Sequence, residues 1–326
     1  MSSAISVKHL HKTFKTKVKK EGLQASIKAI FKPHYKHITA VDNISFEIES
    51  GELVAFIGPN GAGKSTTLKM LSGILVPDSG NITILGLDPH QKRKEVAFQI
   101  GTVFGQKPQL WFHLPAIDTF KLFSKIYELD EQEYQKRVKY LIKLFEIEEV
   151  VEQPVRKLSL GQRMRCEFVL ALLHKPKVIF LDEPTIGLDV TVKKIVRELI
   201  KMVNEKEGVS IILTSHDMGD IEHLCKRVII INKGKLVYDG LLESIKQKYM
   251  TTKLVKVQTE NKIDLPSYKG IRIVNKESFQ ALLEVDTTQC QLKEVIDSLL
   301  KKNQINDIII QENPIEDIID SIYSEK

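Results

Sequence analysis

The sequence predicts an α/β protein, with a larger N-terminal domain built on a parallel sheet and a small α+β domain after it. Short apolar runs of strand length end in glycines or acidic residues, as Leu53–Ile57 and Val178–Leu181 do, and patterns of helical period separate such runs. From about Thr251 the pattern changes to three strands, a helix, a strand and a final helix. We therefore expect a first domain over residues 1–245 and an accessory domain over residues 246–326.

The composition is that of an ordinary globular protein, with 42% hydrophobic and 28% charged residues among 326. Cys166, Cys225 and Cys290 are far apart and form no CxxC pair, which favours a reducing compartment and argues against a disulfide framework or zinc site. No stretch approaches the ~18–20 apolar residues of a membrane helix. The first residues contain no apolar signal sequence. We therefore expect a chain that does not cross a membrane by itself.

The strongest functional signal is the segment Gly58–Ser65, which matches the phosphate-binding pattern G-x-x-x-x-G-K-[ST]. An apolar strand precedes it and a helical pattern follows, which is the order that phosphate binding at a helix N-terminus requires. We expect Lys64 to neutralise the β- and γ-phosphates of a nucleotide and the Ser65 hydroxyl to coordinate Mg²⁺. The candidate nucleotide-binding residues here are Gly58, Pro59, Asn60, Gly61, Ala62, Gly63, Lys64, Ser65 and Thr66.

Two further segments carry polar groups suited to a nucleotide site. "GTVFGQ" ends a β-like run at Gln106, whose amide can reach Mg²⁺ or the attacking water. "LSLGQRMRCE" contains Ser159, Gly161 and Gln162 just before a predicted helix, so a hydroxyl, an accessible backbone and an amide lie at a positive helix end. The second segment therefore predicts another phosphate contact.

Acidic residues and a histidine follow two more predicted strands. Asp182 and Glu183 come directly after Val178–Leu181, and His216 ends the run "VSIILTSH". Side chains at the carboxyl ends of parallel strands point into the ligand crevice of an open sheet. We expect Asp182 to hold Mg²⁺, Glu183 to polarise the attacking water, and His216 to hydrogen-bond the γ-phosphate.

Taken in chain order and together with Asp189, these segments resemble the motifs of the nucleotide-binding subunits of ABC transporters. There they are the Walker A, Q-loop, signature, Walker B, D-loop and H-switch motifs, and the resemblance covers roughly Ile5 to Gly240. It implies a P-loop NTPase (ABC ATPase) core with a helical subdomain over about residues 90–165, and hydrolysis of ATP with Mg²⁺.

The resemblance also implies a head-to-tail pair of subunits, with each ATP lying between the Walker A motif of one copy and the signature of the other. Ser159, Gly161, Gln162 and Asp189 would then serve the partner's nucleotide. Leu160 departs from the family, which more often has glycine there. The family stacks the adenine on an aromatic residue after the first strand, and Phe14 is favoured over Tyr35 for that position.

Separate membrane subunits dock on the helical subdomain in this family. "QLWFHLP" carries Trp111 and Phe112, which can either line that docking groove or belong to the local core. The closing "PIEDIIDSIY" resembles the C-terminal appendage of ATPases that serve ABC-2-type exporters. We expect ABC-2-type permease subunits as partners, export as the direction, and a cytoplasmic location on the inner face of the membrane.

A basic insertion over about residues 15–37 departs from the common pattern. It holds seven lysines and one glutamate between Lys15 and Lys36, a local charge of +6 that equals the net charge of the chain. Its helical pattern can lie on an anionic membrane, dock on a partner or remain a solvated surface helix. Because the rest of the chain is balanced in charge, we expect no nucleic-acid partner.

Two other functional classes are less well supported by the sequence. Soluble ABC ATPases that act on ribosomes carry two cassettes in a chain, and those that act on DNA insert a long coiled coil before the signature; this sequence has neither. A purely regulatory nucleotide-binding module would lack Glu183 or His216, and both are present.

Overall fold

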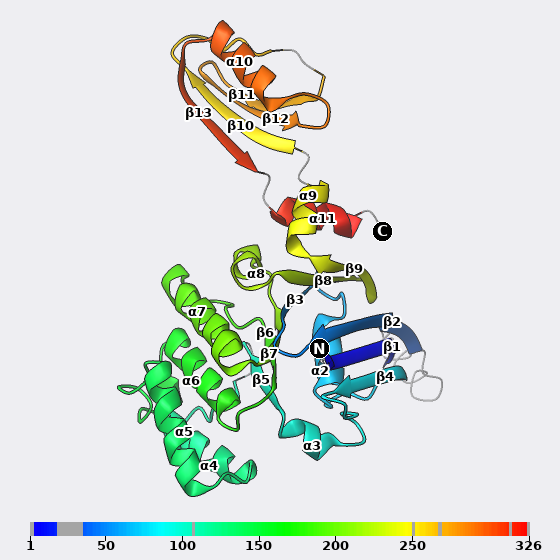
Figure 1. The fold of residues 1–326 in the computed structure, drawn as a ribbon, viewed down its shortest axis with the longest axis vertical. Helices are drawn as coiled ribbons and strands as arrows, with labels where there is room; N and C mark the ends of the chain where they lie inside the picture. Colours follow the sequence, from blue (N-terminus) through cyan, green and yellow to red (C-terminus); the bar gives the residue numbers. More distant parts are fainter. Residues whose placement is uncertain are drawn as a thin grey trace, which may run out of the picture. The chain divides into compact units, whose positions relative to one another are not determined.

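The computed structural model describes residues 3–17, 35–105, 108–249, 252–266, 269–312 and 315–324. The chain divides into two compact units, Met1–Gly240 and Leu241–Lys326 (Figure 1). Within the described parts of the chain, no helix has the length and apolar character needed to cross a membrane.

The first unit contains two sheets. One is antiparallel, in the order β2-β1-β4, and the other has the order β5-β6-β7-β3-β8-β9, with parallel pairing from β5 through β8. The strands are β1 (Ser3–Lys17), β2 (Tyr35–Glu49), β3 (Leu53–Ile57), β4 (Ser79–Ile84), β5 (Ile100–Phe104), β6 (Val178–Asp182), β7 (Ser210–Thr214), β8 (Arg227–Asn232) and β9 (Lys235–Leu241). Because β5, β6, β7 and β3 run in one direction, the residues that follow them meet at one edge of the sheet.

Helices connect these strands: α2 (Lys64–Leu71), α3 (Arg93–Ala97), α4 (Ala116–Ile126), α5 (Glu131–Leu144), α6 (Leu160–Leu172), α7 (Val190–Glu207) and α8 (Met218–Leu224), with a 3₁₀ turn at Val155–Lys157. Figure 1 shows α4, α5 and α6 grouped together, and α6 packs against both of the others and against β5. These helices form the helical subdomain. The predicted range of about 90–165 began too early, because it includes β5, which belongs to the parallel sheet.

The core of the first unit joins the two sheets through α2. Leu68, Met70 and Leu71 of this helix are buried in one cluster with side chains of both sheets, and Phe46 of β2 lies 5.6 Å from Phe56 of β3 between ring centroids. The apolar face of α2 therefore fixes where its N-terminus, which carries the phosphate-binding loop, meets the parallel sheet.

The second unit is an antiparallel sheet in the order β11-β12-β10-β13, with α10 on one face. Val255, Leu283, Val295 and Leu299 are fully buried between them. The elements are α9 (Leu242–Tyr249), β10 (Thr252–Thr259), β11 (Ile271–Lys276), β12 (Gln280–Asp286), α10 (Leu292–Lys302), β13 (Ile305–Glu312) and α11 (Ile315–Ser324). Helix α9, which the sequence placed at the end of the first domain, is grouped with the second unit and contacts α11.

The ends of the basic insertion extend the antiparallel sheet. Strand β1 continues to Lys17 and β2 begins at Tyr35, and these two residues pair across the ribbon. The predicted amphipathic helix of the insertion lies outside the described residues, as does Gln106.

Candidate functional site

The loop after β3 bends tightly against its neighbours. Gly63, at the N-cap of α2, has φ 108°, and a Cβ built on it would lie 2.3 Å from the Ala40 carbonyl oxygen. A Cβ on Gly58 would lie 2.2 Å from the Ile231 carbonyl oxygen. Both positions therefore require glycine, the first because of its backbone conformation and both because of the close approach.

Lys64 is held inside this loop. Its side chain is 7% exposed, and Nζ donates hydrogen bonds to the carbonyl oxygens of Gly58 and, at 3.3 Å, Pro59. Burial lowers the pKa of Lys64, and the carboxylates of Glu183 and Asp182 oppose that shift. An ammonium group bonded only to carbonyl oxygens can exchange them for the stronger charge-assisted contact with phosphate oxygens.

Asp182, the last residue of β6, is oriented from two sides. Its Oδ2 accepts a hydrogen bond from Ser65 Oγ at 3.2 Å, and Oδ1 accepts one from Thr214 Oγ1 at 2.7 Å. Thr214 ends β7 and pairs with Asp182 in the sheet register. A hydroxyl and a carboxylate at this spacing are the hard oxygen donors that Mg²⁺ prefers, so the residues present fit that ion. Sequence reasoning missed Thr214, which could have been found by aligning the polar residues that end these two strands.

The next residue, Glu183, adopts an uncommon backbone conformation with φ 55°. Its N–H donates to the Thr214 carbonyl oxygen at 3.1 Å, and its Oε2 accepts from the His216 N–H at 3.2 Å. Oε1 is buried and accepts no hydrogen bond from the described residues, although His216 Nε2 lies 3.3 Å away. Burial raises the pKa of Glu183, while the neighbouring His216 and Lys64 act in the opposite direction. A buried carboxylate oxygen without a donor can accept a proton from water.

Most of these groups line one cavity of about 640 Å³, while Gly58 and Thr214 are not among its described lining residues. It brings together Pro59–Thr66, Gly105, Asp182, Glu183 and His216. Gly105, the residue before Gln106, donates its N–H to the Asp182 carbonyl oxygen at 2.9 Å. The sequence-predicted phosphate loop, both acidic residues and the histidine therefore meet at the edge of the sheet where β3, β6 and β7 end.

Other predicted site residues lie outside the described lining of this cavity. Ser159 and Gln162 form a capping box at the start of α6, where Ser159 Oγ accepts from Gln162 N–H at 3.2 Å and Gln162 Oε1 accepts from Ser159 N–H at 2.9 Å. Asp189 caps α7 by accepting from Val192 N–H at 3.0 Å. These side chains therefore stabilise helix ends in the single chain.

The two aromatic candidates for the adenine contact are on the β1–β2 ribbon. Phe14 pairs with Ile38 and is 38% exposed, while Tyr35 pairs with Lys17 and is 55% exposed. Ala40, further along β2, is the residue of this ribbon that lines the cavity among those the structure describes. Because Phe14 pairs with Ile38, its position along the ribbon is three residues nearer to Ala40 than the position of Tyr35.

Comparisons with known proteins show the family and fold to which the chain is similar. The family model described as ABC transporter matches residues 41–186. The chain is 37% identical over 215 residues to the ABC transporter ATP-binding protein NatA of Bacillus subtilis (strain 168), which covers 66% of this chain and 87% of that protein. It is 32% identical over 272 residues to the linearmycin resistance ATP-binding protein LnrL of the same organism. This match covers 82% of this chain and 87% of that protein. Among solved structures it is similar to a dimeric post-hydrolysis state of the ATP-binding cassette MJ0796 bound to ADP and Pi, with 26% identity, a TM-score of 0.61 and coverage of 73% of this chain and 98% of that one.

Proposed function

This chain belongs to the family of ABC transporter ATP-binding proteins, and we propose that it drives export through separate ABC-2-type membrane permease subunits. As a member of that family it is an ATPase with a P-loop NTPase fold. The observation that carries the ATP-driven part of the proposal is the cavity shared by the phosphate loop, Asp182, Glu183 and His216. Export through ABC-2-type subunits rests on the resemblance of the closing "PIEDIIDSIY" to the C-terminal appendage of ATPases that serve such exporters. The soluble class that acts on ribosomes or DNA is not favoured, because the relatives named above are transporter subunits or resistance proteins.

In the proposed mechanism the backbone N–H groups of the loop and Lys64 bind the β- and γ-phosphates of ATP. Ser65, Asp182 and Gln106 would hold Mg²⁺, which when bound supplies positive charge to the phosphate oxygens. Glu183 uses Oε1, which accepts no hydrogen bond from the described residues, to orient and polarise the attacking water, and His216 hydrogen-bonds the γ-phosphate. Support for these roles comes from the Ser65–Asp182 and Glu183–His216 contacts.

A second copy of the chain completes the site in this proposal. Ser159, Gly161 and Gln162 of one copy contact the γ-phosphate held by the other, with Asp189 at the same interface. The positive N-terminus of α6, which these residues form, favours a phosphate there. The dimeric state of the similar MJ0796 cassette supports this arrangement. We propose Phe14 as the adenine contact.

The membrane partner docks near Trp111 and Phe112 in this proposal. Both precede α4 of the helical subdomain, and they are 49% and 52% exposed. Two neighbouring aromatic side chains exposed to this extent form a surface suited to an apolar partner. The protein would thereby sit at the inner face of the membrane, with the basic segment 15–37 available to anionic headgroups. The unit Leu241–Lys326 is proposed as an accessory domain without a catalytic role.

Glu183→Gln tests the core of this proposal. The amide keeps the shape of the side chain but cannot act as a base, so we expect slow hydrolysis and an ATP-bound dimer detectable by light scattering. Glu205→Gln on the exposed face of α7 is the matched control, expected to hydrolyse ATP normally. If Glu183→Gln remains monomeric with ATP although it binds the nucleotide, self-pairing of this chain is wrong. If it hydrolyses ATP at the wild-type rate, the role of Glu183 is wrong.

A further inference from the structure

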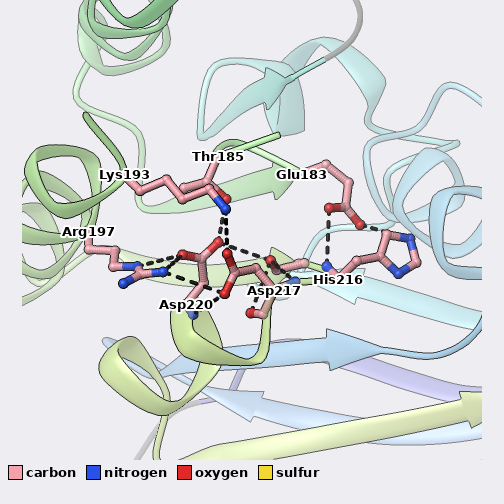
Figure 2. Close-up of polar contacts among 8 residues, drawn as sticks. Glu183, Thr185, Lys193, Arg197, His216, Asp217 and Asp220 are labelled. Atoms are coloured by element: carbon pink, nitrogen blue, oxygen red, sulfur yellow. Dashed lines mark hydrogen bonds and ion pairs between the residues drawn. The ribbon is translucent and has the colours of Figure 1, made fainter. Parts of the chain in front are cut away.

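A fully buried carboxylate, that of Asp220, lies near Glu183 and His216, the residues proposed above to act in catalysis (Figure 2). Asp220, on α8, has 0% exposure. Its Oδ2 accepts hydrogen bonds from Thr185 Oγ1 and, at 3.1 Å, from Ser215 Oγ, and its Oδ1 lies 2.5 Å from Nε and from Nη2 of Arg197. Every donor belongs to a different segment of the chain. One carboxylate therefore joins the loop after β6, the loop after β7 and helix α7.

Two of these donors are close in sequence to the proposed catalytic residues. Thr185 follows Glu183 by two positions, and Ser215 directly precedes His216. The distance between the two loops is thus set on one side by the Glu183–His216 contacts and on the other by the shared bonds to Asp220 (Figure 2). Movement of either loop away from the other would break a hydrogen bond to a buried charge.

Such bonds are stronger than those between neutral groups. The acceptor is a carboxylate that pairs with Arg197 and is out of contact with water, so it depends on these donors for its stabilisation. Arg197 supplies the opposite charge with a side chain that is 19% exposed. The backbone N–H of Asp220 also bonds to Asp217, which caps α8 and pairs with Lys193. These contacts hold Asp220 in a fixed position, so its hydrogen bonds to Thr185 and Ser215 can in turn fix the positions of both loops.

We propose that Asp220 is a positioning residue for ATP hydrolysis, which fixes the loops of Glu183 and His216 at their present separation through Thr185 and Ser215. The inference rests on the catalytic roles proposed above. It assigns to Asp220 no contact with nucleotide. A displacement of about 1 Å in a catalytic group can reduce a rate by about a hundredfold, so loss of this carboxylate should slow the chemical step and leave ATP binding intact.

The alternative is that Asp220 only joins α7 to α8 and supports the fold. The two roles differ in what a substitution changes. Structural support affects the fraction of folded protein, whereas positioning affects the rate constant of each folded molecule. A single-turnover measurement with enzyme in excess over ATP gives a rate constant that does not depend on the active fraction, provided that the enzyme concentration is raised until the rate constant no longer increases and ATP binding and pairing are both saturated.

The experiment compares Asp220→Asn, Thr185→Val and Glu183→Gln in the full chain, with Glu222→Gln as control for loss of an exposed carboxylate on the same helix. Thr185→Val preserves the shape of the side chain and removes only the link between Asp220 and the Glu183 loop. We expect the single-turnover rate constant of Asp220→Asn to fall about tenfold or more, that of Thr185→Val to fall in the same direction, and ATP affinity to stay at the wild-type value. Glu222→Gln should match the wild type.

The outcomes separate the inference from the function on which it rests. If Asp220→Asn and Thr185→Val keep the wild-type rate constant while Glu183→Gln abolishes hydrolysis, positioning by Asp220 is wrong and the catalytic proposal stands. Positioning is equally wrong if the variants lose ATP affinity at an unchanged rate constant. If Glu183→Gln hydrolyses ATP normally, the proposed function itself fails. Should Asp220→Asn not fold, Thr185→Val decides the question alone.

Discussion

The backbone N–H of His216 donates to Glu183 Oε2 at 3.2 Å, while the His216 ring Nε2 lies 3.3 Å from Oε1 of the same carboxylate. The two residues follow the neighbouring parallel strands β6 and β7. The contact leaves Oε1 without a well-oriented donor among the described groups and places an imidazole beside it. The backbone bond therefore aims the carboxylate, and the ring adds a second polar group at the same point of the cavity.

Replacing His216 with alanine should separate catalysis from binding. The phosphate loop and Lys64 do not depend on the imidazole, so we expect ATP binding to persist while hydrolysis falls by about a hundredfold, within the usual range for loss of one such group. Phosphate release and calorimetric binding measure the two quantities. His223→Ala, on the exposed side of α8, is the control. Equal losses in affinity and rate would contradict the prediction.

Gly161 should tolerate no side chain unless Val192 is also changed. A Cβ at Gly161 would lie 2.5 Å from Val192 Cγ1 on α7, so Gly161→Ala should destabilise the protein by about 1–3 kcal/mol through overpacking. Val192→Ala removes the obstructing methyl groups, and the double variant should recover stability in denaturant unfolding. Hydrolysis should stay low in the double variant, because in the proposed dimer the new methyl group would still block the approach of the partner's phosphate. Recovery of hydrolysis together with stability would limit Gly161 to a packing role.

Trp111→Ala should affect assembly without affecting ATP binding. The indole is 49% exposed and is not among the described residues that line the nucleotide cavity. We expect the purified variant to bind ATP like the wild type and to recover less membrane protein in affinity purification from native cells. Tyr140→Ala on α5, 45% exposed, controls for loss of a large surface aromatic residue. Unchanged recovery with Trp111→Ala would remove this residue from the docking surface.

His174 should make the fold sensitive to acid. Its Nε2 donates to the Ile100 carbonyl oxygen at 2.9 Å, its ring stacks on Tyr127 at 3.8 Å, and burial lowers the His174 pKa to about 4. The unfolded histidine has a pKa of about 6.5. Between these values the unfolded chain takes up a proton that the folded chain does not, so the free energy of unfolding decreases as pH falls through that window.

His174→Gln removes this titration and should flatten the dependence. Denaturant unfolding at about pH 7 and about pH 5 measures it for both proteins. Above about pH 6.5 the histidine is neutral in both states and contributes no slope. An identical loss of stability on acidification in wild type and variant would show that other groups are responsible.

The fold class and the centre of the site were predictable because their signals are local. A glycine loop between an apolar strand and a helix has few other uses, and acidic residues at strand ends need only the parallel arrangement to meet. Asp220 was not predictable, because in the run "SHDMGDIEH" it resembles the solvated residues of a surface helix. Its burial results from α7 and the loops after β6 and β7, which are distant in sequence. The sequence predicts the β-like run that forms β5, but its membership of the parallel sheet depends on pairing with β6, which is also distant in sequence.

Glu183 has a left-handed backbone conformation, with φ 55°. Stability and activity therefore favour different residues at this position. A side chain other than glycine costs about 1–2 kcal/mol in that conformation, and the rest of the domain must offset this cost. Substitutions that relax the backbone here also remove the carboxylate that is proposed to activate water. A laboratory selection for thermostability alone would therefore be expected to enrich inactive variants at this position, so such a screen needs a turnover assay beside it.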